Sequence, residues 1–134
     1  MAKIVLTNAY VSVNGVDLSD HVASISLATQ YDIVETTQFG DTSKRRVAGL
    51  ADNSITLEFH QDFQAGSVES VIYPLLGTAT NCIVKPIDAA RSASNPQYSF
   101  SVLINEWTPL NGAAGELATA SVTWLISGDI TKTT

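Results

Sequence analysis

Apolar and polar residues alternate along most of this chain, and a period of two predicts β-strands. In the clearest run, 53–61, Ile55, Leu57 and Phe59 share one face while polar residues occupy the other. Shorter alternating runs lie at 9–13, 24–27 and 99–106, and a short apolar strand is expected at 81–85. Asn14-Gly15 follows the first of these runs and predicts a tight type I′ hairpin turn, because both central residues of that turn need a positive φ. The pattern therefore predicts a mainly antiparallel β protein.

The last long run, 117–126, differs from the others because both of its faces are apolar. Leu117 and Leu125 lie on one face. The opposite face consists of Ala118, Ala120, Val122, Trp124 and Ile126. Such a strand is typical of the centre of a sheet, or of a surface that a neighbouring subunit covers.

One segment, 67–77, breaks the period of two. Its apolar residues fall at helical spacing and form a single stripe of Val68, Val71, Ile72, Leu75 and Leu76. Ser67 is a candidate N-cap and Gly77 a candidate stop, while Pro74 predicts a kink or a tightened last turn. A helix this short must pack its stripe against a sheet. We therefore expect a single domain over 1–134, an antiparallel two-sheet β-sandwich or barrel with one flanking α-helix.

Three stretches predict loops. The longest, Thr36–Asp52, contains the only basic cluster, Lys44-Arg45-Arg46. Two shorter polar stretches lie at 88–96 and 108–116, and we expect the tail 131–134 to be frayed or ordered by a partner.

This chain has few charged residues, and acidic residues outnumber basic ones. Charged residues make up 15% of the 134 residues, against roughly 25% in typical soluble domains. So low a content suggests that much of the surface faces other protein. The net charge of −6 argues against a nucleic-acid-binding face, which would be basic. No apolar run is long enough for a membrane span and no secretory signal is evident, so we expect synthesis in a cytoplasm.

Candidate chemistry is limited to two histidines and one cysteine. Asp20-His21 and His60-x-Asp62 place imidazoles near carboxylates, but no nucleophile motif or phosphate-binding loop accompanies them. A structural metal site would need more ligands than these. Cys82 lies in an apolar strand and is best interpreted as a buried small side chain. We expect neither enzymatic activity nor a cofactor.

The basic cluster Lys44-Arg45-Arg46 has two main interpretations. It is either a solvated loop tip or a contact to an acidic patch on a neighbouring copy of this acidic chain. Binding to a polyanion is a weaker third interpretation, because three cations do not offset the surplus of carboxylates. Trp107 and Trp124 are interpreted as core residues, with an interface anchor as the alternative.

Two stretches carry a resemblance to a known family. The first stretch joins Phe39-Gly40-Asp41, Lys44-Arg45-Arg46 and Gly49-Leu50-Ala51-Asp52 to the strand Ser54–Phe59. The second is Ser67–Gly77, which closes on Pro-Leu-Leu-Gly. Together with the polar last strand, these stretches resemble the small tail tube (major tail) proteins of long-tailed bacteriophages.

The resemblance implies a structural role. It implies two packed sheets with one helix, and six copies closing a ring that stacks into the tail tube of a virion. It also implies that genomic DNA passes through without specific binding, and that tape-measure, tail-tip and tail-terminator proteins are partners. The long loop would reach the adjacent ring through Phe39, Gly40, Asp41, Lys44, Arg45 and Arg46.

Other classes remain open. A tail terminator or head-completion protein would share the β composition but form a finite ring. A tube protein of a phage-derived injection particle would look nearly the same in sequence. A small carbohydrate-binding sandwich would need an exposed aromatic platform, and the pattern shows none.

Overall fold

The computed structural model describes residues 3–134, and within them eight strands form one antiparallel sheet. The strand order is β2-β1-β5-β6-β7-β4-β3, and β8 pairs with β6. The strands are β1 (Tyr10–Val13), β2 (Val16–Asp17), β3 (Val22–Glu35), β4 (Arg46–His60), β5 (Ala79–Lys85), β6 (Gln97–Leu103), β7 (Thr119–Ile126) and β8 (Thr131–Thr133). The helical elements are α1 (Val68–Ile72) and the 3₁₀ turns η1 (Ser19–His21) and η2 (Tyr73–Leu75).

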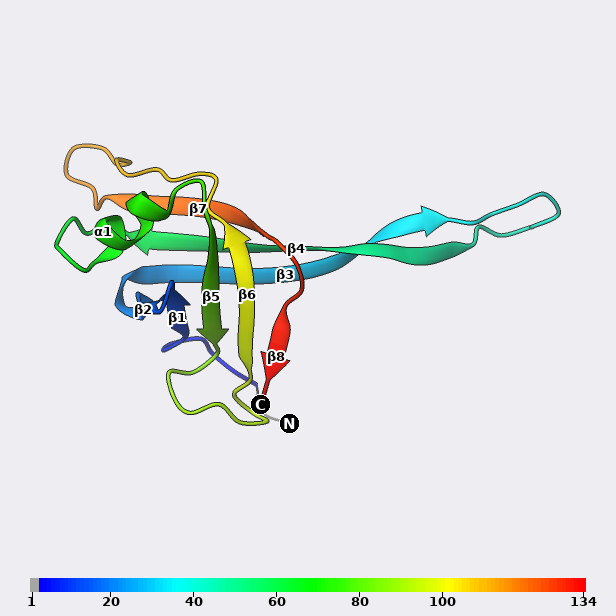
Figure 1. Cartoon of the computed structure of the whole chain (residues 1–134), viewed down its shortest axis with the longest axis horizontal. Helices are drawn as coiled ribbons and strands as arrows, with labels where there is room; N and C mark the ends of the chain where they lie inside the picture. Colours follow the sequence, from blue (N-terminus) through cyan, green and yellow to red (C-terminus); the bar gives the residue numbers. More distant parts are fainter. Residues whose placement is uncertain (1–2) are drawn as a thin grey trace.

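The mainly antiparallel β fold with one helix is confirmed, but the sheet is continuous and not divided into two. Figure 1 shows β3, β4 and β7 running nearly at right angles to β5 and β6. The two halves stay hydrogen-bonded where Val102 and Leu103 of β6 pair with the end of β7. The two expected layers are therefore one sheet folded over itself, in the manner of an orthogonal packing.

The core lies inside this fold and follows the sequence alternation. Ile55, Leu57 and Phe59 of β4 are at most 1% exposed. Trp124 is fully buried, and Phe59 packs against it and against Trp107, at 6.2 Å and 5.8 Å between ring centroids. The interpretation as a core residue is confirmed for Trp124, whereas Trp107 is partly buried and packs against the edge of the core. The run 117–126 was expected either at the centre of a sheet or under a neighbouring subunit. The first environment is found, because β7 pairs with β4 on one side and with β6 on the other.

The flanking helix is shorter than its apolar stripe. Val68 and Ile72 of α1 are fully buried, and Val71 and Leu75 are partly buried against the core. Leu76 was expected in the same stripe, but it is 43% exposed. The chain tightens into η2 at Tyr73, with Pro74 inside this 3₁₀ turn, and Leu76 follows it with non-helical backbone angles (φ −58°, ψ 128°), so Leu76 leaves the helical stripe.

Hydrogen bonds correct two further expectations. Ser67 makes no capping bond to the helix; its hydroxyl donates to Asp62 Oδ2 at 2.8 Å. The tail 131–134 is not frayed, because Thr131–Thr133 pairs with the start of β6 as β8. The turn at Asn14-Gly15 is confirmed, with both residues at positive φ between β1 and β2.

The expected loop 36–52 is largely strand. β4 begins at Arg46, so only residues 36–45 connect the two strands. The alternating pattern does not predict this extension of β4, because Gly49 and Leu50 interrupt it. These two residues lie at a register shift opposite residues 31–33 of β3. The loops expected at 88–96 and 108–116 are found largely as expected.

Replacing Ile72 with alanine is expected to destabilise the fold by about 2–5 kcal/mol, because a fully buried side chain leaves a cavity under α1. The matched change Leu76→Ala lies in the same segment but on an exposed side chain, and is expected to cost less than about 0.5 kcal/mol. Urea denaturation followed by tryptophan fluorescence measures both. Equal losses for the two variants would contradict the packing described for α1 and η2.

Candidate assembly surface

The most prominent surface of the molecule is a two-stranded arm, defined here as residues 31–51. It is the continuation of β3 and β4 beyond the folded body, and it projects into solvent as a long hairpin (Figure 1). A strand rises about 3.3 Å per residue, so each ten residues of an extended hairpin strand span about 33 Å. Nothing in the described chain covers either face of this ribbon, so its side chains are exposed almost throughout.

Apolar side chains lie on both faces of the arm, because residues opposite each other in an antiparallel pair share a face. The register pairs Tyr31 with Ala51 and Ile33 with Ala48 on one face, and Val34 with Val47 on the other. These side chains are exposed, and so is Leu50 in the same ribbon, at 82%. A lone hairpin is at best marginally stable in water. An arm of this composition therefore indicates a surface that other protein covers.

A bulge bends the arm near its middle. Pairing shifts by one residue between Tyr31 and Ile33, with the extra residue on β4. Gly49 lies in this bulge, where an added Cβ would meet Val34 Cγ2 at 3.2 Å and the Asp32 backbone oxygen at 3.3 Å. A glycine thus suits the close approach of the two strands, and the bulge increases their local twist.

The tip of the arm, residues 36–45, is an ordered turn. Thr36 N–H donates to the Arg45 carbonyl at 2.8 Å, and Arg45 N–H donates to Thr37 Oγ1 at 2.9 Å. Asp41 accepts a hydrogen bond from Gln38 N–H at 2.9 Å and pairs with the Arg45 guanidinium at 3.3 Å. Gly40 has a positive φ of 92°, which a turn this tight requires.

Five of the six residues expected to contact an adjacent ring lie in this tip, and the sixth, Arg46, begins β4 next to it; the six divide into two groups. Asp41 and Arg45 hold the turn together, and the Asp41 side chain is only 11% exposed. Phe39 is fully exposed, and Lys44 and Arg46 form no ion pair with any described residue. These three are therefore free to meet another molecule, and their contact with a second copy stays a prediction.

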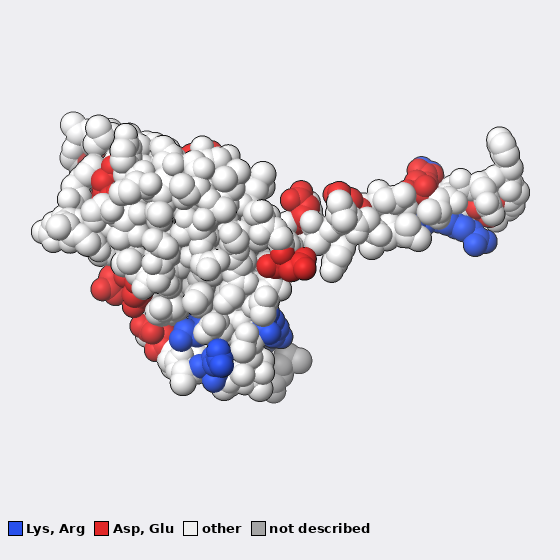
Figure 2. Space-filling model, in the orientation of Figure 1, with Lys and Arg blue, Asp and Glu red and all other residues white. Residues whose placement is uncertain are grey.

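The root of the arm is polar and acidic, which the sequence interpretation missed. Asn53, 4% exposed, accepts a hydrogen bond from Thr29 and donates one to the Gly128 carbonyl at 3.3 Å. It thereby ties the departing strands to the turn before β8. Asp32 and Asp52 follow on the arm and Asp129 follows on the turn. Figure 2 shows acidic residues along the arm from root to tip, and basic residues of the arm only near its tip. Only the tertiary structure brings Asp129 beside Tyr31 and Ala51 of the arm, on the face opposite to Asp52.

A second polar cluster joins η1 to the loop before α1. His21 Nε2 lies 2.9 Å from Asp62 Oδ2 and 3.3 Å from Ser67 Oγ, and Ser67 also donates to that same carboxylate oxygen. A catalytic triad needs the serine and the carboxylate on opposite ring nitrogens. Here both contact Nε2, so the cluster fixes the loop 62–67 and does not build a nucleophile.

The remaining candidate groups are also structural or isolated. Cys82 is 2% exposed and desolvation raises its pKa to about 12, as expected for an inert buried thiol. His60 is exposed at the end of β4. Within residues 3–134, no three His, Cys, Asp or Glu side chains converge to hold a metal ion, and no helix is long and apolar enough to span a membrane.

No protein-family model matches the sequence, and no curated protein matches it. Solved structures do match. A chain of an extracellular contractile injection system, solved as the PVC sheath/tube terminator in the extended state, is 16% identical with a TM-score of 0.74, covering 100% of this chain and 99% of that one. A chain of the virion of a native gene transfer agent particle is 10% identical with a TM-score of 0.73, covering 95% and 96%.

A third similar chain comes from the baseplate of the anti-feeding prophage, at 10% identity and a TM-score of 0.60, covering 99% of this chain and 97% of that one. Identities this low establish a shared fold over nearly the whole length. They do not by themselves assign an activity or a position in a particle.

The His21–Asp62–Ser67 cluster predicts a contribution to acid stability. The pKa of Asp62 is lowered from 3.8, chiefly by the Gln64 backbone N–H, then by the Ser67 hydroxyl and by His21. A carboxylate whose pKa is depressed in the folded state adds stability that is present above its unfolded pKa and lost as pH falls through the folded value. The free energy of unfolding should therefore fall more steeply below about pH 4 in the wild type than in Asp62→Asn.

Urea titrations at a series of acidic pH values measure this slope. Ser67→Ala removes one of the hydrogen bonds and should give an intermediate slope. Identical slopes for the wild type and Asp62→Asn would contradict the role assigned to this cluster.

Proposed function

We propose that this protein is a structural subunit of a phage tail or of a phage-derived injection particle, and specifically that it forms rings that stack into the tube. The observation that carries the proposal is the arm, a two-stranded ribbon with exposed apolar side chains on both faces, which none of residues 3–134 covers. Such a ribbon gains its stability from neighbouring copies. The fold shared with chains of tail and injection particles supports the same assignment.

The free edge of the sheet supports ring formation. β3 ends the strand order, so its outer edge has no strand partner over the described residues. An edge of 14 residues is an aggregation hazard unless a designated partner pairs with it or covers it. Closure of a ring through this edge would satisfy its backbone groups and limit the number of copies. Six copies per ring is the number that the resemblance to tail tube proteins suggests.

The acidic balance suits a conduit for DNA. A net charge of −6 per copy gives a ring that repels phosphate, so a genome could slide through without sticking. In this proposal the protein resides in the virion tail after synthesis in the host cytoplasm. Its partners are further copies of itself and the tape-measure, tail-tip and tail-terminator proteins.

A terminator ring is the second candidate function. It is favoured by one specific observation, the match over 100% of this chain to a chain in a sheath/tube terminator structure. A terminator would form discrete rings, whereas a tube protein would add ring upon ring. The tube protein of an injection particle that carries no genome is the third arrangement compatible with this fold.

Electron microscopy of the concentrated full-length protein, beside light scattering, tests the proposal. Hollow tubes are expected, and discrete rings would favour the terminator. Changing Lys44, Arg45 and Arg46 together to glutamate should block stacking and leave the circular dichroism spectrum of the body unchanged, because the tip lies outside the core. Normal tubes from this variant would contradict the role of the tip, and a protein that stays monomeric under all conditions would count against assembly itself.

A further inference from the structure

The folded sheet leaves two faces open to solvent, one on each half of the fold. The first, called the β4 face here, consists of the outward side chains of β3 at 24–32, of β4 at 52–60 and of β7 at 119–125. These side chains alternate with inward ones, which in the body belong to the core or pack against it. The second, the β5 face, consists of the outward side chains of β1, β2, β5, β6 and β8, on the opposite side of the core. A ring of copies can turn either face toward its axis.

A difference in charge distinguishes the two faces. Asp52 and Glu58 of β4 and Asp32 of β3 lie on the β4 face, and none of the three forms an ion pair with a described residue. Serine and threonine occupy most of the other positions of this face, and lysine and arginine occupy none. On the β5 face, Asp17 is offset by Lys85. The β4 face is therefore anionic, whereas the charges of the β5 face balance.

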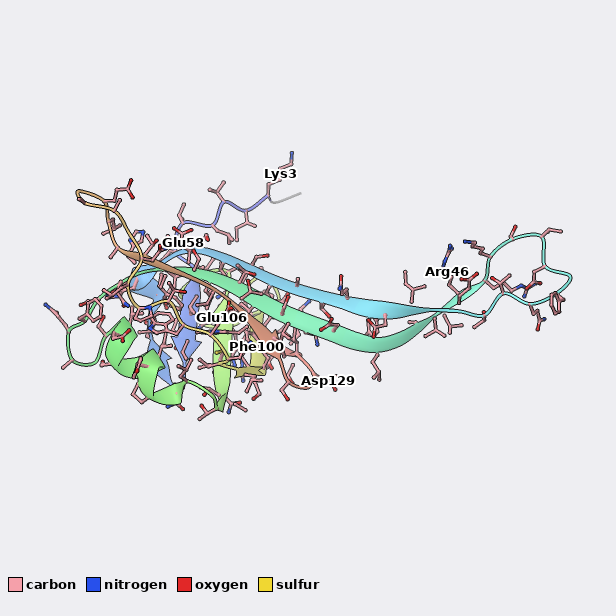
Figure 3. The ribbon with its side chains drawn as sticks, turned by 90° about the horizontal axis from the view of Figure 1, so that it is seen from above. Lys3, Arg46, Glu58, Phe100, Glu106 and Asp129 are labelled. Carbon is pink, nitrogen blue, oxygen red and sulfur yellow. The ribbon has the colours of Figure 1, made fainter. Side chains whose placement is uncertain are left out.

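The second layer of the fold lies behind the β4 face. Figure 3 shows Glu58 on one side of the ribbon formed by β3 and β4, and α1 and Phe100 of β6 on the other. Phe100 is a core residue, so the second half of the sheet packs against the first from that side. Lys3 belongs to the N-terminal segment, which runs past the free edge of β3 (Figure 1) and is not part of the β4 face. The β4 face thus points away from the second layer and from the helix.

Ring closure through the free edge of β3 decides which side of the molecule is turned to the axis. Such closure makes β3, β4 and β7 of each copy a segment of the ring wall. In a closed ring, the space available to each copy grows with distance from the axis. The second layer and α1 therefore fit on the outside of the wall, and the β4 face points inward.

We propose that the β4 face lines the channel, and that Asp52 and Glu58 of successive copies form two rings of carboxylates around it. A polyanion in the channel meets like charge and hydroxyl groups, and no cation on this face binds its phosphates through counterion release. The inference rests on the proposed function and deepens it, because it names the surface that nucleic acid passes and the residues that keep it from binding.

Cysteine labelling in assembled particles tests the orientation. Thr56→Cys places a thiol on the β4 face, and Asn81→Cys places one on the β5 face; both native side chains are exposed. Each variant is doped into an excess of wild-type chain so that particles form. It is then treated with a small maleimide or with a maleimide attached to a globular protein wider than the channel. The unassembled variants give the reference rates, and the native Cys82 is buried and does not compete.

We expect position 56 in particles to react with the small reagent and to lose its reaction with the bulky one, while position 81 keeps its reaction with the bulky reagent. Reaction of position 56 with the bulky reagent at the unassembled rate would place the β4 face outside the channel. Loss of reaction with both reagents would show that a protein contact covers this face. Either result overturns the inference.

Charge reversal gives a second and independent readout. Particles of Asp52→Lys with Glu58→Lys, incubated with a short DNA duplex, are expected to retain DNA that a nuclease does not digest, whereas wild-type particles retain none. The matched control, Asp88→Lys with Asp129→Lys, has the same net charge but carries its lysines away from the β4 face. DNA bound by the control should stay sensitive to the nuclease. Equal sensitivity of the DNA on both variants would contradict the assignment of Asp52 and Glu58 to the channel.

The outcomes separate this inference from the proposed function. Particles in which position 56 is as accessible as position 81 would overturn the channel assignment and leave the assembly of rings standing. If the wild-type chain forms no rings or tubes at all, both fail. Circular dichroism of each variant shows whether a loss of assembly arises from misfolding.

Discussion

The structure depends on one strand that passes between two environments. β4 buries Ile55, Leu57 and Phe59 under a second layer of the sheet, and then continues past Asn53 where that layer ends. On the buried side, alternation removes every second side chain from water and stabilises the body through the hydrophobic effect. Beyond Asn53 the same strand pairs only with β3. The arm, its exposed apolar faces and its need for neighbours all follow from the place where the covering layer stops.

The sparse charge of the chain is consistent with that arrangement. A β protein with a long free edge and few charges would aggregate without control unless its exposed surfaces have specific partners. Charge is also unevenly distributed along the arm, because its basic residues lie only near the tip while acidic residues lie along it from root to tip (Figure 2).

The polar groups of the body have structural functions that follow from their geometry. His21, Asp62 and Ser67 converge on one imidazole nitrogen and hold the chain that leads into α1. Asn95 forms hydrogen bonds with the backbone of Ile87, Ala89 and Ala90, and so organises the loop between β5 and β6. Trp107 Nε1–H donates to Glu69 at 2.7 Å and links α1 to the segment before β7. These bonds satisfy buried or half-buried polar groups and rigidify the connections around the core.

The sequence by itself determined the strands of the body, the Asn14-Gly15 turn and the existence of one short helix, because local alternation and turn chemistry are readable residue by residue. It also identified the tip residues, since a lone basic cluster stands out in an acidic chain. Only the tertiary structure decided that residues 46–52 are strand, that 131–133 pairs with β6 and that Asp129 lies beside Tyr31 and Ala51 of the arm. Each of these depends on pairing or packing between residues far apart in the chain, which no local pattern contains.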